Sequence, residues 1–282
     1  MKLFNRLKTG FSLVRRSVRV LADHPKLALF PLTAGVAGLG FLGVLWASLF
    51  AVGEVSSLAT YAGLFAFYLA STFVSAFFTA GLMYCSRQAF GGETPRIGDG
   101  LRAASRNVGP LLIWSVVSAT VGVLLRVLQD NDTPVARILA AMFSVAWTVM
   151  TYFVIPVVVF EDVGTVEMFS RSKETVTETW GESMGAVGGI GLVTVAFGVV
   201  GAVPGVALLV VGSGAVGLFG LLVLVAGVML AALSAQTLTG IAKTALYVYA
   251  TEDETPAYFD GIDFGDAEGS ISARRPGSGG FV

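Results

Sequence analysis

Three stretches of the chain contain no charged side chain: residues 27–53, 55–86 and 183–242. A transmembrane helix needs about 20 consecutive apolar residues, so the first two stretches each fit one span and the third fits two. A membrane β-barrel would instead show short segments of alternating polarity. Only 13% of the residues are charged, roughly half the share of a soluble domain. The sequence therefore predicts an all-α, polytopic membrane bundle.

Six transmembrane helices account for the apolar residues. Residues 108–125 and 138–160 are also apolar and add one span each. The first stretch exceeds the core of a signal peptide, about 7–15 residues, so we interpret it as a retained span. Gly212 and Gly214 favour a turn within the longest stretch. The expected spans are 27–52, 56–86, 108–126, 137–160, 184–211 and 215–245.

Arginine and lysine are concentrated on one side of the predicted spans. The connection between the first two spans carries only Glu54, whereas four arginines lie between the second and third spans. The positive-inside rule then predicts that both termini lie in the cytoplasm. We expect the membrane to be the plasma membrane. The basic residues before the first span are Lys2, Arg6, Lys8, Arg15, Arg16, Arg19 and Lys26.

An amphipathic segment precedes each predicted pair of spans. Its apolar residues recur at steps of three and four, which is typical of one face of a helix. We therefore predict a single membrane domain, residues 1–250, made of three parallel repeats at about 1–90, 91–162 and 163–250. Each repeat would be an interfacial helix followed by a transmembrane hairpin. The apolar line of the first segment consists of Phe4, Leu7, Phe11, Val14, Val18 and Leu21.

The polar faces of these segments suggest different partners. The first is basic, and we expect it to bind anionic lipid headgroups. The third carries Glu167, Glu174 and Glu178, so we expect it to pack on other cytoplasmic segments, such as the basic first helix. Residues 251–282 are acidic and rich in glycine and serine, which predicts a disordered cytoplasmic tail. A homo-oligomer or a membrane-protein partner stays open, and no nucleic-acid partner is expected.

The sequence around the fourth span resembles a known group of proteins. The stretch TYFVIPVVVFEDVGTVEMFSRSKETVTETWGES has a proline near a span end, an acidic pair, and an amphipathic helix with Ser170 and Trp180. This pattern resembles a broad group of uncharacterised six-helix prokaryotic membrane proteins. The stretch GFSLVRRSVRVLADHPKLALFPL is similar to the opening of a haloarchaeal-type family of unknown function within that group. The group includes membrane domains fused to glycerophosphodiester phosphodiesterases, but the sequence contains no such soluble domain. The resemblance implies a fold and no activity.

Polar turns lead the amphipathic segments into the spans. Asp23 and His24 precede Pro25, which fits the first turn of a helix because an N–H needs no partner there. Asp23 or His24 is placed to cap that helix. The corresponding turns contain Pro110 and Trp180 and no histidine. The pattern therefore favours structural joints over a catalytic Asp–His pair.

A few polar residues in the predicted spans are candidates for a transport pathway. Pro156 removes an amide donor, so a kink or helix end is expected near Tyr152. Gln236 and Lys243 share one face of the sixth span, and an intramembrane lysine often marks a substrate or ion pathway. Lys243 also lies near the predicted cytoplasmic exit, where its side chain can reach the headgroups. Pro156, Gln236 and Lys243 are the candidate lining residues of a permease.

Two acidic residues, Glu161 and Asp162, follow the fourth span directly. Charged groups at the membrane interface usually find partners, so we expect pairing with Arg171 or Lys173. Binding of a cation is the alternative.

Small residues in the fifth span predict close helix packing. Glycines spaced four residues apart let helix backbones approach each other. Whether this contact lies within the chain or between subunits stays open. The glycines are Gly181, Gly185, Gly189, Gly201 and Gly205.

Convergent catalytic groups are missing from the predicted spans. The chain has one histidine, His24, one cysteine, Cys85, and no carboxylate pair within a span. We therefore expect no catalytic, metal or cofactor site. The leading hypothesis is a non-enzymatic integral membrane protein with an accessory or membrane-organising role at the cytoplasmic leaflet. The alternative is a small-solute or ion permease lined by the fourth and sixth spans.

Overall fold

The computed structural model describes residues 2–52, 57–130, 133–161, 163–179, 187–252 and 255–260. Every regular element in these ranges is helical, as the composition predicts. The elements are α1 (Lys2–Asp23), η1 (Pro25–Ala28), α2 (Leu29–Val52), α3 (Ser57–Phe90), α4 (Ile97–Arg106), α5 (Val108–Gln129), α6 (Pro134–Met150), α7 (Val154–Phe160), α8 (Glu167–Thr179), α9 (Val187–Val211), α10 (Ala215–Glu252) and η3 (Ala257–Phe259).

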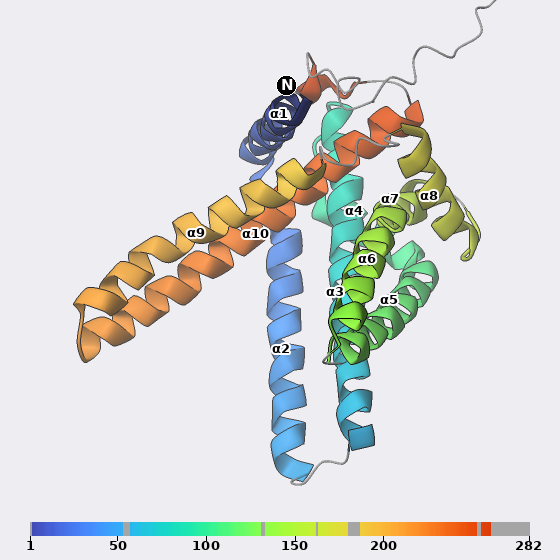
Figure 1. Cartoon of the computed structure of the whole chain (residues 1–282). Helices are drawn as coiled ribbons and strands as arrows, with labels where there is room; N and C mark the ends of the chain where they lie inside the picture. The colour runs from blue at the N-terminus through green and yellow to red at the C-terminus, as the bar shows by residue number, and fades with distance from the viewer. Residues whose placement is uncertain are drawn as a thin grey trace, which may run out of the picture.

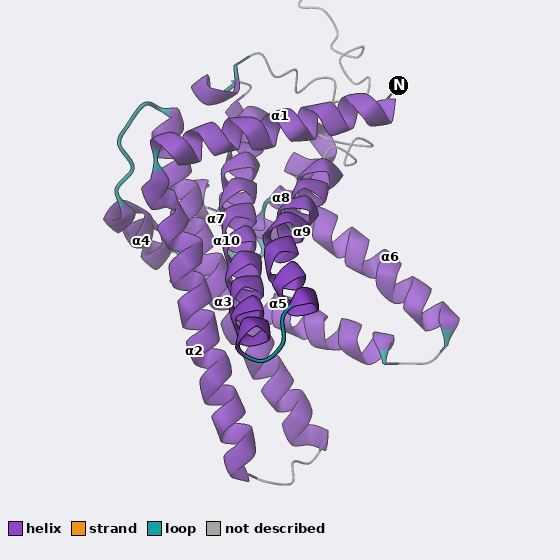
Figure 2. Cartoon of the chain, turned by 90° about the vertical axis from the view of Figure 1, so that its left-hand side faces the viewer, coloured by secondary structure: helices purple, strands orange, loops and turns teal. Residues whose placement is uncertain are grey.

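Three helical hairpins give the molecule its shape (Figure 1). They are formed by α2 with α3, α5 with α6, and α9 with α10, and the two helices of each hairpin contact each other. The hairpins point away from the end that holds the N-terminus and splay apart from one another (Figures 1 and 2). A shorter helix precedes each hairpin in the chain: α1, α4 and α8 respectively.

Five segments have the length and apolar composition needed to cross a membrane. They are Pro25–Leu45, Thr60–Phe90, Val108–Gln129, Pro134–Phe160 and Ala215–Glu252. Six were expected. The remaining one corresponds to α9, in which Gly198–Val211 forms a shorter apolar helix. Residues 184–186 of that expected span lie outside the described residues. The predicted turn at the glycines is confirmed, because α9 ends at Val211, α10 begins at Ala215 and Gly214 has a φ of 58°.

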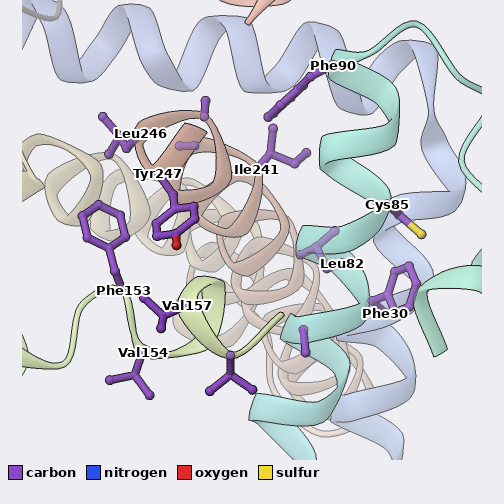
Figure 3. Close-up of a cluster of buried hydrophobic side chains, with 14 of the residues drawn as sticks. Phe30, Leu82, Cys85, Phe90, Phe153, Val154, Val157, Ile241, Leu246 and Tyr247 are labelled. Carbon is purple, nitrogen blue, oxygen red and sulfur yellow. The ribbon is translucent and has the colours of Figure 1, made fainter. Parts of the chain in front are cut away.

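The buried core lies where α3, α7 and α10 meet (Figure 3). Ile241 and Tyr247 contribute from α10, Leu82 from α3 and Val157 from α7. The hairpin tips, in contrast, carry many exposed apolar side chains, such as Val210 and Leu222. Such a surface is unfavourable in water and suits lipid. The hairpins are thus joined by one core at the end that holds the short helices.

The three short helices contact different neighbours. α1 packs on α9 and α10, α4 packs on α3, and α8 packs on α6, α7 and α10. The expectation that α8 packs against α1 is wrong, since the two helices lie on opposite sides of the molecule (Figure 1). Helix α8 is held instead by its own basic residue, Arg171, whose Nε lies 2.8 Å from the carboxylate of Glu161 after α7.

The apolar line expected on α1 is only partly buried. Val14 is buried, but Phe11 and Val18 are exposed, and Leu13 and Val20 face the protein instead. The side chains of residues 2–10 lie outside the described set. Helix α1 is therefore rotated about its axis from the orientation that its apolar periodicity predicts.

Helices α9 and α10 approach each other through glycines. A Cβ atom added to Gly201 would lie 2.5 Å from the carbonyl oxygen of Gly227, and one added to Gly205 would lie 2.3 Å from Cα of Leu224. Gly201 and Gly205 therefore lie in a contact within the chain. Gly189 belongs to the first turn of α9, and Gly181 and Gly185 lie outside the described residues.

Candidate functional site

The joint between α1 and α2 differs from the expected cap. His24 occupies the N-cap position of η1 and Pro25 begins that helix, but no side-chain capping hydrogen bond forms. The capping role expected of Asp23 or His24 is therefore wrong. Both side chains lie instead at Tyr258: its hydroxyl lies 3.4 Å from Nε2 of His24 and is hydrogen bonded to Asp23. The two side chains therefore bind a residue that follows α10 and do not cap the helix that begins at Pro25.

Residues 255–260, here called the tail segment, pack against the start of the chain. Nη1 of Arg16 donates to the carbonyl oxygen of Tyr258 at 3.2 Å, and Nη2 donates to that of Asp260 at 2.9 Å. The Phe259 side chain is fully buried and lies edge-on to Phe90 of α3, with ring centroids 5.5 Å apart. This part of the expected disordered tail is therefore ordered. Residues 253–254 and 261–282 lie outside the described residues.

Packing against α1 changes the chemistry of Tyr258. Burial raises the pKa of its phenol above the ordinary value of 10.0, and the hydrogen bond and negative charge of Asp23 raise it further. The hydroxyl therefore stays protonated, and available to donate, throughout the physiological pH range.

The fourth span is broken at the position that Pro156 predicts. α6 ends at Met150 and α7 begins at Val154, so the break includes Tyr152. Pro156 has no N–H group and therefore cannot donate a helical hydrogen bond to the carbonyl of Tyr152. Ser172 of α8 joins the two pieces. Its hydroxyl donates to the Met150 carbonyl at 2.9 Å and accepts from the Phe153 amide at 3.0 Å. A buried serine from a neighbouring helix thus satisfies backbone groups that the break exposes.

Charged and aromatic side chains gather just beyond this break. Glu161 accepts a hydrogen bond from the hydroxyl of Tyr247 on α10. Its other oxygen accepts from Nε of Arg171 on α8 at 2.8 Å, so the predicted pairing of Glu161 with Arg171 is confirmed. The hydrogen bond and charge of Glu161 raise the pKa of Arg171 further above its ordinary value. Asp162, the other half of the acidic pair, lies outside the described residues.

A second ion pair extends this group. Arg87, near the end of α3, pairs with Glu252, at the end of α10. The Arg87 guanidinium also lies over the ring of Phe160, 5.0 Å from its centroid, and Phe160 stacks on Tyr247. We call the six residues the junction cluster: Arg87, Phe160, Glu161, Arg171, Tyr247 and Glu252.

The three candidate permease-lining residues lie in different surroundings. Pro156 is buried in the core, and Gln236 is exposed. Lys243 is half-buried, and its Nζ lies over the ring of Tyr152, 4.2 Å from the centroid. The geometry joins Lys243 to the break in the fourth span but does not assemble the three residues into one lining.

The other residues singled out in the sequence lie outside the junction cluster. Pro110 lies in the first turn of α5, as expected of a joint, and Trp180 lies outside the described residues. Cys85 is buried, and its thiol donates to the carbonyl oxygen of Arg96 at 3.3 Å. In the described part of the chain, no three His, Cys, Asp or Glu side chains are grouped so that they could hold a metal ion.

Sequence reasoning missed several residues of this region. Ser172 looks like any polar residue of an amphipathic helix, and Tyr247 looks like any apolar residue of a span. Arg87 is one of the four arginines between the second and third predicted spans, and nothing in the sequence indicates its pairing with Glu252. One signal was available: Tyr258 and Phe259 are adjacent aromatic residues in an acidic segment, and aromatic residues are scarce in disordered tails.

Comparison with known proteins gives a family and no activity. No curated protein and no solved structure matches the chain. The matches include neither a haloarchaeal-type family nor a membrane domain of glycerophosphodiester phosphodiesterases, so that part of the resemblance is unsupported. Residues 58–257 match a family model that covers α3 to the start of η3. The chain therefore belongs to the family of unknown function DUF6159.

Proposed function

We propose that this chain is a non-enzymatic integral membrane protein with an accessory or membrane-organising role at the cytoplasmic leaflet. Five membrane-length segments support its place in a bilayer. We further propose that α9 is also a span, the fifth of six in chain order, because it is a 25-residue helix without a charged side chain. Both termini would then lie on the same side, which the positive-inside rule assigns to the cytoplasm of a plasma-membrane protein.

The observation that carries this proposal is the internal pairing of the junction cluster. Glu161 is bound by both Tyr247 and Arg171, and Arg87 is bound by Glu252 and Phe160. These groups hold α3, α7, α8 and α10 together and are satisfied by one another. Their chemistry is that of a structural connection between the hairpins, and the hairpins themselves carry many exposed apolar side chains that suit lipid.

A permease is the second candidate, and Lys243 favours it. Its ammonium group lies within a membrane-length segment and contacts Tyr152 at the break in the fourth span. The Tyr152 hydroxyl is buried without a hydrogen-bond partner among the described residues. Broken helices and intramembrane lysines are both features of transport pathways.

Reconstitution of the full chain into liposomes tests the two candidates. The measurements are ion conductance, osmotic swelling in solutes of increasing size, and self-quenching of a fluorescent phosphatidylglycerol. The accessory role predicts conductance and swelling equal to those of protein-free liposomes, with self-quenching that rises with protein content because lipid is organised around the protein.

The variant Lys243→Ala gives the decisive comparison, with the exposed Lys173→Ala of α8 as the control that removes the same charge. A flux that Lys243→Ala abolishes and Lys173→Ala preserves would overturn the accessory role and establish the permease.

A further inference from the structure

Helix α1 has two different faces. One face, formed by Leu13, Val14, Ser17 and Val20, is buried against the protein. On the opposite side, Phe11 is 63% exposed and Val18 is 43% exposed. Residues three, four and seven positions apart lie on the same side of a helix, so the arginines at positions 15 and 19 share this outward face.

The two arginines on this face are available for a partner. Arg15 and Arg19 are exposed, and within the described residues neither forms an ion pair. Arg16, between them along the sequence, points elsewhere and holds the tail segment. The outward face of α1, defined as Phe11, Arg15, Val18 and Arg19, therefore combines exposed apolar and cationic groups.

The connection to α2 fixes where this face lies relative to the membrane. Only His24 separates α1 from Pro25, the first residue of a membrane-length segment. α1 then runs across the ends of the hairpins instead of continuing along them (Figure 2). At a rise of 1.5 Å per residue, Val18 is within about 10 Å of the start of that segment. With that segment placed in a bilayer, the outward face would lie at the depth of the lipid headgroups.

We propose that the outward face of α1 binds the anionic headgroup layer of the leaflet on its side of the membrane. Phe11 and Val18 insert at the boundary between headgroups and acyl chains, and the guanidinium groups of Arg15 and Arg19 bind lipid phosphates. The complementary charge identifies the occupant, because a neutral apolar surface would leave both arginines unpaired. This inference rests on the proposed integral membrane placement.

Spin labels on α1 test the proposal in the full chain. Phe11→Cys and Val18→Cys are labelled separately in a Cys85→Ala background and reconstituted into two kinds of vesicle. One kind is phosphatidylcholine alone, and the other is equal parts phosphatidylcholine and phosphatidylglycerol. Collision of each label with oxygen, relative to collision with a water-soluble nickel chelate, reports whether the label lies in lipid or in water.

The expected result is a high oxygen-to-chelate ratio at both positions in the anionic vesicles. Adding Arg15→Gln and Arg19→Gln should lower the ratio of docked to undocked helix at least roughly tenfold, because each basic residue favours an anionic surface about fivefold. Arg102→Gln with Arg106→Gln on α4 removes the same charge elsewhere and should leave the ratio of docked to undocked α1 unchanged.

Three results would overturn the proposal. Labels that stay accessible to the chelate in both kinds of vesicle would show that the face lies in water. A high ratio that does not depend on phosphatidylglycerol or on the arginines would remove the role of anionic lipid. Spin–spin broadening between labels would identify a second copy of the chain as the occupant. Each of these is separate from Lys243-dependent flux, which tests the proposed function and leaves α1 docking unaffected.

Discussion

The hydroxyl of Tyr258 lies 3.4 Å from Nε2 of His24 although the two residues are 234 positions apart. The chain's only histidine is therefore part of a contact that holds the tail segment on α1. Asp23 and Arg16 supply the other polar bonds of this contact, and Phe259 supplies its buried apolar side chain. The joint before the first span and the segment after α10 thus form one structural unit.

Truncating Phe259 should release the tail segment. The ring is fully buried against Phe90, and removing such a ring costs about 3–5 kcal/mol where the site cannot collapse. We expect Phe259→Ala to make residues 255–260 readily cleavable by a protease while the hairpins stay folded, as measured by limited proteolysis and mass spectrometry. His24→Asn is the matched control, because it removes only a 3.4 Å polar contact and should leave cleavage near the wild-type rate. Cleavage of Phe259→Ala at the wild-type rate would mean that the polar contacts, and not Phe259, hold the segment.

The attachment of the tail segment should depend on pH at the alkaline end. Burial and Asp23 raise the pKa of Tyr258 above 10.0, so the protonated phenol is the form that the folded state favours. Its contribution to stability is complete below pH 10 and is lost as the pH rises through the raised pKa. The tyrosinate absorbance of the wild type minus that of Tyr258→Phe should show a midpoint above pH 10. Asp23→Asn should lower this midpoint, and a midpoint at or below 10 that Asp23→Asn leaves unchanged would contradict the assignment.

The helices and their breaks follow from the sequence, whereas their packing does not. Charge-free stretches, the turn at Gly212–Gly214 and the break that Pro156 forces all depend on local composition. In lipid, however, a buried face and an exposed face can be equally apolar, so periodicity does not tell which side of a helix packs. Phe11 and Val18 illustrate this, since they continue the apolar line of α1 and yet lie on its exposed side.

Hydrogen bonds between residues far apart in the sequence could not be predicted either. The pairing of Glu161 with Arg171 could be predicted because only ten positions separate them. Tyr247 binds the same carboxylate from 86 positions away, and nothing in a single sequence indicates that distance. The sequence therefore shows the charged residues of the junction cluster, but only the structure shows that they lie together.

Ser172 should contribute far more to stability than its neighbour Ser170. Ser172→Ala leaves the buried Phe153 amide without its hydrogen-bond acceptor, and such an unpaired group costs about 1–3 kcal/mol. Ser170 is exposed and bonds only within its own helix, so Ser170→Ala should change stability by less than about 0.5 kcal/mol. Unfolding in mixed micelles with increasing dodecyl sulfate, followed by circular dichroism, provides the comparison. A loss for Ser172→Ala as small as that for Ser170→Ala would mean that the break in the fourth span does not depend on α8.

Gly227 should tolerate no side chain, whereas Gly198 should accept one. A Cβ atom at Gly227 would lie 2.1 Å from the carbonyl oxygen of Gly201, so α9 and α10 would have to separate. Such overpacking destabilises by about 1–3 kcal/mol. Gly198, on α9, has no atom within 4 Å of the place where a Cβ would be added. Alanine there should stabilise the protein by about 0.5–1 kcal/mol through its higher helix propensity. The same unfolding titration measures both variants, and a cysteine crosslink between α9 and α10 reports whether the hairpin has opened. If Gly227→Ala were as stable as the wild type with its crosslink intact, the close contact between these two helices would be wrong.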